Sequence, residues 1–222
     1  ASDVYKRQVS TVYANDIYIT QSGATLDLDI LQDGENNTIG SSTTSSSVIG
    51  ATTNFDIRQV GDSNVITFDI NGANYTGTWA ITGNSNNIDF NCDSGGSNSS
   101  CGTATANITW TGSSQDIDLD IGETSSANNA TVNITGASGS DSNVVAATID
   151  GTSAILTLSV NGDTNNWLID IDGNGDINGH TLIHNHTGST ADVDITQSGV
   201  NDNMLNLTTS GDNHDIDIIQ RD

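Results

Sequence analysis

Carboxylates are the most abundant ionisable groups in this sequence, and their oxygens can bind cations. Of its 222 residues, 28 are acidic and only four are basic, so the formal net charge is −24. Segment 170–178, "DIDGNGDIN", spaces its polar side chains as D-x-D-x-N-G, and hard oxygen ligands in such a turn suit Ca²⁺. A complete EF-hand loop is excluded, because Thr181 stands where a bidentate glutamate is required. The alternatives are a plain turn and a calcium turn site formed by Asp170, Asp172, Asn174, Asp176 and Asn178.

Two further segments contain residues that are common in catalytic or metal sites. His180, His184 and His186 fall on one side of a predicted strand, where a pair could bind a transition metal or stand exposed without one. The segment "CDSGGS" around Ser94 resembles the nucleophile segment of chymotrypsin-like proteases. The first histidine of the chain is His180, so no matching base segment precedes this serine. We therefore interpret Ser94 as a loop serine and expect no enzymatic activity.

The cysteines and the net charge indicate the compartment and the partners. Cys92 and Cys101 bracket "DSGGSNSS", which predicts a disulfide over a metal pair or two free thiols. A disulfide favours a secreted, extracellular protein. No apolar run of the chain approaches the length of a transmembrane helix, so we expect no membrane insertion. A polyanion is repelled by nucleic acid and by anionic lipid, and its natural partners are cations.

Short strands must position these residues. Apolar side chains recur with a period of two, proline is absent, and turn-forming residues are abundant. Leu26 and Leu28 share one side of a strand with Gln32, while Asp27 and Asp29 lie on the other. Successive strands start mostly about 9–14 residues apart, which predicts a repeating unit of about 22–25 residues and about eight or nine units.

The turns repeat as well, and inward amides flank them. Segment 34–37, "GENN", is the first of four G-x-x-N turns, in which glycine supplies a positive φ. Amides that point inward need partners, and stacking at the strand spacing of about 4.8 Å would supply them as a ladder. The predicted ladder residues are Gln21, Gln32, Gln59, Gln197, Gln220, Asn37, Asn64, Asn86, Asn165 and Asn203. The predicted turn glycines are Gly34, Gly61, Gly83, Gly162 and Gly199.

This combination favours an all-β fold, a β-solenoid with two short strands per rung and two facing parallel sheets. An antiparallel sandwich or barrel is the alternative, but it explains neither the inward amides nor the recurring turn. We expect one solenoid domain over residues 9–222, with a disulfide-closed loop at 92–101. Residues 1–8 contain "DVYKRQ", which is similar to a translated sequencing-library adapter and is interpreted as a non-native N-terminal scar.

The phrases Gln32-x-Gly34-x-x-Asn37 and Gln59-x-Gly61-x-x-Asn64 resemble the curlin repeat of bacterial biofilm amyloid subunits. The C-terminal "ITQSGVNDNMLNLTTSGDNHDIDIIQ" is similar to the same repeat, whereas the centre, from about residue 75 to 190, has diverged. The resemblance implies a curli-like subunit, secreted to the cell surface or biofilm matrix, whose rungs stack into a fibre.

Open strand edges at both ends of such a solenoid would invite another copy of the chain. The first and last strands look like ordinary rungs, so we expect head-to-tail self-assembly into a homopolymer. The alternative is a monomeric acidic solenoid that acts as an adhesin, a phage-fibre module or an ice-binding module. No cofactor is expected to be required. Divalent cations, with Ca²⁺ favoured, or monovalent salt alone would have to offset repulsion along the rows of outward aspartates.

Overall fold

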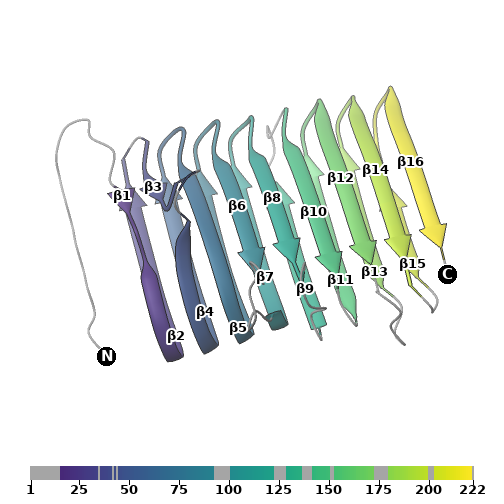
Figure 1. Cartoon of the computed structure of the whole chain (residues 1–222). Coiled ribbons are helices and arrows are strands. Elements are labelled where there is room, and N and C mark those ends of the chain that lie inside the picture. The colour runs from purple at the N-terminus through teal and green to yellow at the C-terminus, as the bar shows by residue number, and fades with distance from the viewer. Residues whose placement is uncertain are drawn as a thin grey trace.

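The computed structural model describes residues 16–34, 36–41, 43, 45–92, 101–122, 129–136, 142–150, 153–172, 180–199 and 203–221. Over these ranges the chain is all-β and forms a parallel β-solenoid of about seven turns without a helix, which confirms the predicted all-β solenoid (Figure 1). No helix of the described chain is long and apolar enough to cross a membrane. The strands are β1 (Asp16–Ile17), β2 (Thr20–Asp33), β3 (Thr38–Ile39), β4 (Ser46–Val60), β5 (Val65–Thr82), β6 (Asn87–Cys92), β7 (Cys101–Thr111), β8 (Asp116–Ile121), β9 (Asn129–Gly136), β10 (Val144–Asp150), β11 (Ala154–Asn161), β12 (Asn165–Asp172), β13 (Thr181–Thr187), β14 (Ala191–Ser198), β15 (Met204–Thr208) and β16 (His214–Arg221).

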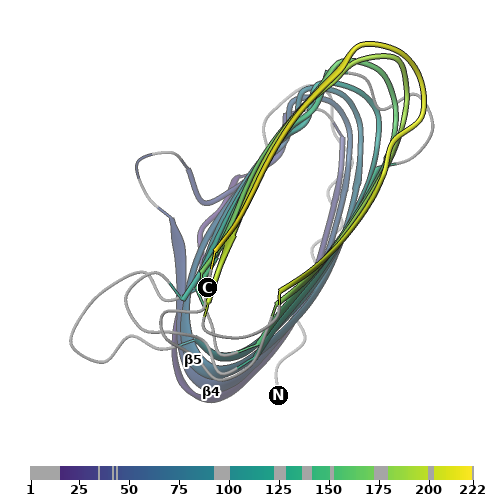
Figure 2. The same cartoon turned by 90° about the vertical axis from the view of Figure 1, so that its right-hand side faces the viewer.

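All strand pairs are parallel, and β5 joins two stacks of strands. The first half of β5 pairs with β6, and its second half pairs with β7. From β6 the even-numbered strands continue to β16, and from β7 the odd-numbered strands continue to β15. We call these stacks the even arm and the odd arm. Viewed along the stack, each turn is a flattened loop that lies over the one before it (Figure 2).

The length of a turn varies more than the sequence predicts. Val193 lies opposite Ile216, and Val144 lies opposite Asn166, so the offsets between these strands agree with the predicted repeating unit. Between β6 and β8 the offset is longer, since Ile88 lies opposite Ile117. The predicted length therefore holds for some turns and is exceeded in others. Longer turns leave room for fewer of them, which explains why the chain makes about seven turns instead of eight or nine.

The core is a set of stacked apolar columns between the two arms. Register pairing places Ile66 on Ile88 and Ile88 on Ile117, so each side chain packs on its equivalent in the next turn. The tryptophans Trp110 and Trp167 are fully buried in these columns. Burying one such side chain stabilises the fold by about 1.5–3 kcal/mol, and each column gains this only through stacking.

A disulfide ties the two arms together where the chain leaves the regular path. Cys92 ends β6, Cys101 begins β7, and their sulfur atoms are bonded at 2.07 Å. Both cysteines are buried, and residues 93–100 between them, including Ser94, lie outside the described residues. The predicted disulfide pair is thus present, and it closes one of the longer connections between successive strands.

Candidate functional surfaces

The G-x-x-N turn is closed by its own asparagine. Asn37 Nδ2 donates to the carbonyl of Gly34 at 2.9 Å, three residues earlier. Asn64 repeats this bond to Gly61 at 2.7 Å, and its Oδ1 accepts the backbone N–H of Asn37 in the turn below at 2.9 Å. One amide therefore closes its own turn and also holds the backbone of the preceding turn. The same closing bond joins Asn86 to Gly83 (3.1 Å) and Asn165 to Gly162 (2.8 Å).

Sequence reasoning missed two members of this asparagine column. Gln115 occupies the equivalent position between Asn86 and Asn143, and its backbone N–H donates to Asn143 Oδ1 at 3.0 Å. Asn143 Nδ2 in turn donates to Asn165 Oδ1 at 3.0 Å. The signal was present in "GSSQ" at 112–115, which is the G-x-x-N phrase with the longer amide.

The glutamines form pairs, not one continuous ladder. Gln59 Nε2 donates to Gln32 Oε1 at 2.7 Å inside the core, and Gln220 Nε2 donates to Gln197 Oε1 at 2.9 Å. The first pair stops because Ile81 follows Gln59 in register.

The last two predicted ladder residues have different neighbours from the glutamine pairs. Gln21 lies opposite Val48 in the next turn, so no glutamine of the described residues stacks on it. Asn203 Oδ1 accepts the backbone N–H of His180 at 3.1 Å, which is the contact that the asparagine column makes elsewhere.

Two turn glycines show why the backbone needs glycine there. Gly83 has φ +142°, and a Cβ added to it would lie 1.7 Å from the carbonyl oxygen of Gly61 in the turn below. Gly34 has nearly the same conformation, φ +137°, but a Cβ there would meet no atom within 4 Å, since no described turn lies beneath it. Glycine is thus required at Gly34 for its positive φ alone, and at Gly83 both for its positive φ and for the close contact with the turn below. Gly162 and Gly199 also lie at turns between strands.

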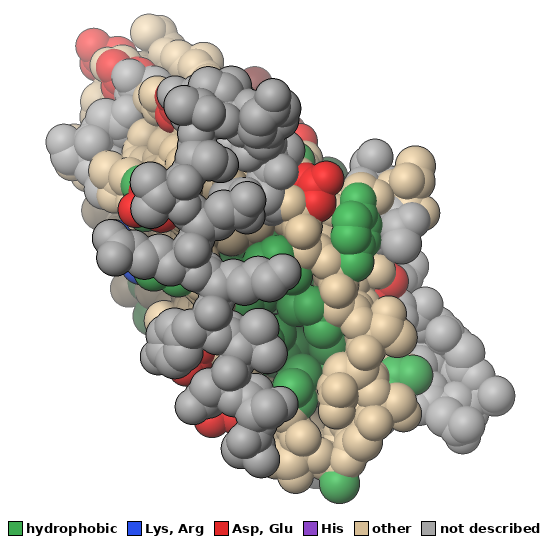
Figure 3. Space-filling view, turned by 90° about the vertical axis from the view of Figure 1, so that its left-hand side faces the viewer, with side chains coloured by type: hydrophobic (Ala, Val, Ile, Leu, Met, Phe, Trp, Pro, Cys, Tyr) green, Lys and Arg blue, Asp and Glu red, His purple; other side chains and the backbone are tan. Residues whose placement is uncertain are grey.

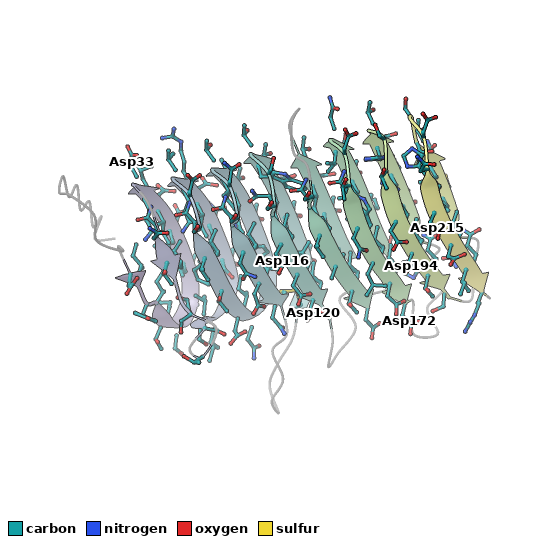
Figure 4. All side chains as sticks on the ribbon, turned by 90° about the horizontal axis from the view of Figure 1, so that it is seen from above. Asp33, Asp116, Asp120, Asp172, Asp194 and Asp215 are labelled. Atoms are coloured by element: carbon teal, nitrogen blue, oxygen red, sulfur yellow. A yellow bond between two sulfur atoms is a disulfide. The ribbon has the colours of Figure 1, made fainter. Side chains whose placement is uncertain are left out.

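Outward aspartates project from β2 and β4 and from the even arm, and several of them are labelled in Figure 4. The expected uninterrupted rows do not form, because no more than two aspartates follow one another in any described column. Asn54 Nδ2 donates to Asp27 Oδ1 at 2.9 Å, and Ser198 Oγ donates to Asp172 Oδ1 at 2.9 Å, so neutral partners interrupt the columns. The directly stacked pairs are Asp29–Asp56, Asp89–Asp118, Asp150–Asp172, Asp192–Asp215 and Asp194–Asp217.

Three of these aspartates have raised pKa values, because they are partly buried and lie close to other carboxylates. Partial burial, followed by the charges of Asp118 and Asp69, raises the pKa of Asp89. Partial burial, with Asp116 next, likewise raises the pKa of Asp118. At Asp170 burial, then the charge of Asp172, has the same effect on the pKa. The even arm therefore carries carboxylates whose charge is destabilised, and cations near them would lower that free energy.

The predicted calcium turn is only partly described. Asp170 and Asp172 end β12 with exposed side chains, whereas Asn174, Asp176 and Asn178 lie outside the described residues. Among the residues that are described, no group of three His, Cys, Asp or Glu side chains could hold a metal ion. Calcium at this turn stays a prediction.

The histidines of β13, His184 and His186, are buried in the core. From the sequence we expected only a metal site or exposed side chains for them, so their burial was not predicted. His184 is fully buried, with its ring centroid 4.9 Å from that of Trp167, and both its nitrogens lack a hydrogen-bond partner among the described groups. Burial, then the nearby charges of His186 and His214, lowers its pKa to about 4. His186 Nε2 lies 2.7 Å from the carbonyl oxygen of Gly162, so its ring also helps to close a turn.

Comparisons of the chain with protein-family models, with curated proteins and with solved structures gave no match. The resemblance to the curlin repeat therefore rests on the quoted residues alone. What the protein does has to be argued from its columns, its two ends and its outer faces.

Proposed function

We propose that this protein is a structural subunit that adds head to tail to copies of itself and builds an extracellular β-solenoid fibre. In this proposal each turn is a curlin-like rung with one strand in each of two facing sheets, and the fibre belongs to a bacterial cell surface or biofilm matrix. The observation that carries it is the chemical match, in four inward columns, between the first and the last described turns.

On the even-arm side, like side chains stand at both ends of a column. The column that begins with Ile17 ends with Ile216. The column that begins with Gln21 ends with the pair Gln197 and Gln220. If a second copy continued the register, its Gln21 would stack on Gln220 and extend that amide pair. This would give Gln21 a glutamine partner, which it does not have among the described residues of its own chain.

The odd-arm side matches in the same way. Leu28 begins a column that ends with Leu205, and Ile30 begins one that ends with Leu207. Leu28 and Leu205 are only partly buried within one chain. Stacking a second copy would bury aliphatic side chains on aliphatic side chains, which is the main source of stability in every internal turn.

Both end turns also offer hydrogen-bonding edges. Within the described ranges β1 and β2 pair on one side only, and so do β15 and β16. At the β2 end, hydrophobic side chains gather in the middle of the face (Figure 3). Such an edge is a template for another strand, and the parallel register of this fold is the arrangement that it would extend.

The acidic exterior would set the conditions for assembly. Two carboxylates about 4.8 Å apart repel by about 0.9 kcal/mol even at the dielectric of water. Stacked aspartate pairs therefore favour the binding of cations, above all divalent ones such as Ca²⁺. The same negative charge disfavours lateral contact between fibres through the even arm. The disulfide supports an oxidising, extracellular location.

A pair of neighbouring residues provides the test. Ile218 and Ile219 are equally exposed, at 42%, but Ile218 continues the inward column of Ile195 whereas Ile219 continues the outward column of Thr196. Ile218→Asp should therefore place a charge in the stacking face, and Ile219→Asp should not. Thermal melting of the dilute chains should be similar for the two variants.

Filament formation is followed by electron microscopy and by the protein concentration that remains in the supernatant. The wild type and Ile219→Asp should form filaments, and Ile218→Asp should raise the residual concentration at least tenfold, or about 1.4 kcal/mol per added subunit. Monodisperse wild-type particles at high concentration, in calcium and in sodium chloride, would refute the proposal. Equal behaviour of the two variants would refute the proposed register.

A further inference from the structure

The outer side of the odd arm differs from the rest of this acidic surface. Its outward positions lie in 74–82 of β5, 103–111 of β7, 131–135 of β9, 155–161 of β11 and 181–187 of β13. Of these 21 alternate positions, 12 are threonine and none is Asp, Glu, Lys, Arg or His. We call this surface the threonine face. A chain with a net charge of −24 thus has an uncharged sheet surface from β5 to β13, although the same columns carry Asp29, Asp56 and Arg58 in β2 and β4.

The threonine face is regular in two directions. Thr76, Thr105 and Thr131 stack directly across three consecutive turns. In the neighbouring column Asn133 Nδ2 donates a hydrogen bond to Asn107 Oδ1 at 2.9 Å. Neighbours in a column are about 4.8 Å apart, and outward positions along one strand repeat about every 6.6–6.8 Å. Because threonine is stiff about χ1, its hydroxyl and methyl groups repeat on nearly the same grid.

Crystalline water repeats on a similar grid. Hydrogen-bonded oxygens about 2.8 Å apart in a tetrahedral network have second neighbours at about 4.6 Å. The hexagonal stacking of that network repeats after eight thirds of the bond length, or about 7.4 Å. Both repeats agree with the two spacings of the threonine face to within about a tenth. Hydroxyl groups can join such a network as donors and acceptors, while the methyl groups between them occupy its gaps.

Other ligand classes fit this surface less well. Carbohydrate and protein partners usually rest on exposed aromatic side chains, and here the large rings of Trp79 and Trp110 are buried beneath the face. Cations would bind the even arm, where the carboxylates are. A neutral, flat and periodic surface is instead complementary to a neutral, periodic solid.

We propose that the threonine face binds the surface of ice, by holding a first layer of water in ice-like order. This inference is independent of the head-to-tail fibre, because the face runs along the side of the stack and not across its ends. In a fibre, each subunit would present its own threonine face along the side of the stack, and the charged outward positions of β2 and β4 would separate one face from the next.

One substitution on each arm tests it. Thr105→Tyr places a ring in the middle of the threonine face, and Thr148→Tyr makes the same change at an exposed outward position on the even arm. Tyrosine suits a strand as well as threonine does, so both variants should keep the circular dichroism of the wild type. Each protein, with an inert protein of similar mass as reference, is allowed to partition into slowly growing ice.

The wild type and Thr148→Tyr should enter the ice in several-fold higher proportion than the reference, and Thr105→Tyr should lose at least four fifths of that excess. Exclusion of the wild type to the level of the reference, or equal loss in both variants, would overturn the proposal. It would also be overturned if Thr105→Tyr dispersed laterally bundled filaments without any ice partition of the wild type, because that result assigns the face to a second copy. Ile218→Asp should retain ice partition, which separates this test from that of the fibre.

Discussion

Replacing His184 with leucine should stabilise the C-terminal turns, and the gain should grow as the pH falls. His184 is fully buried in β13, and the register places it between Leu158 and Leu207, so leucine would match both neighbours. Its two ring nitrogens are buried without a hydrogen-bond partner among the described groups. Removing a buried unpaired polar group should recover about 1–3 kcal/mol of unfolding free energy at neutral pH.

The acid-dependent part follows from the pKa of this ring. Burial, and then the charges of His186 and His214, lowers it from 6.5 to about 4. The pKa is thus lower in the folded chain, so the unfolded chain binds more protons between these two values. The stability associated with neutral His184 is complete above about pH 6.5 and is lost as the pH falls toward 4. The linkage relation gives a loss of about 2 kcal/mol between pH 7 and pH 5.

Urea denaturation of the wild type and of His184→Leu at pH 7 and pH 5, followed by circular dichroism and tryptophan fluorescence, measures this effect. Trp167 reports locally, since its ring centroid lies 4.9 Å from that of His184. The difference between the two proteins should widen by about 2 kcal/mol at pH 5. His186 and the aspartates with raised pKa values are common to both proteins, so their titration largely cancels. A difference that is the same at both pH values would refute the reasoning.

Three further substitutions probe the turn column and the acidic pairs. Gly83→Ala and Gly34→Ala should share a conformational penalty of about 1–3 kcal/mol for their positive φ, but Gly83→Ala should lose about 1–3 kcal/mol more, because only its Cβ meets a backbone oxygen of the turn below. Equal melting temperatures of these two variants would contradict the close stacking of the turns. Asp194→Asn should raise the stability by about 0.5–1 kcal/mol at low salt, since it removes repulsion from Asp217, and the gain should fade at about 1 M salt. A gain that is independent of salt, or a wild type that calcium stabilises no more than sodium at equal ionic strength, would argue against cation condensation on these pairs.

Local patterns were enough to predict strands, inward amides and turns, because each depends on side chains close in sequence. The period of two identified Gln32 and Gln59 as inward residues, and G-x-x-N identified Asn37 and Asn64 as turn residues. The consequences of stacking were harder to predict, because the offset between turns varies. Gln21 has the right parity for the ladder, but the length of its turn places Val48 on it and not a glutamine. The aspartate rows end as pairs because a neutral residue is next in register, as Thr78 is after Asp56 and Ala146 after Asp118.

By itself, then, the sequence determined the all-β solenoid class, the side of each strand that faces the core and the disulfide between Cys92 and Cys101. Alternation and turn chemistry encode these features within a few residues. Only the tertiary structure decided which residues meet across turns: that His184 lies in the core against Trp167, and that charge gathers on one arm while threonine gathers on the other. The physical reason is that stacking brings together residues that lie a full turn apart in the sequence. The number of residues in a turn differs from turn to turn, so local sequence patterns do not fix which residues meet.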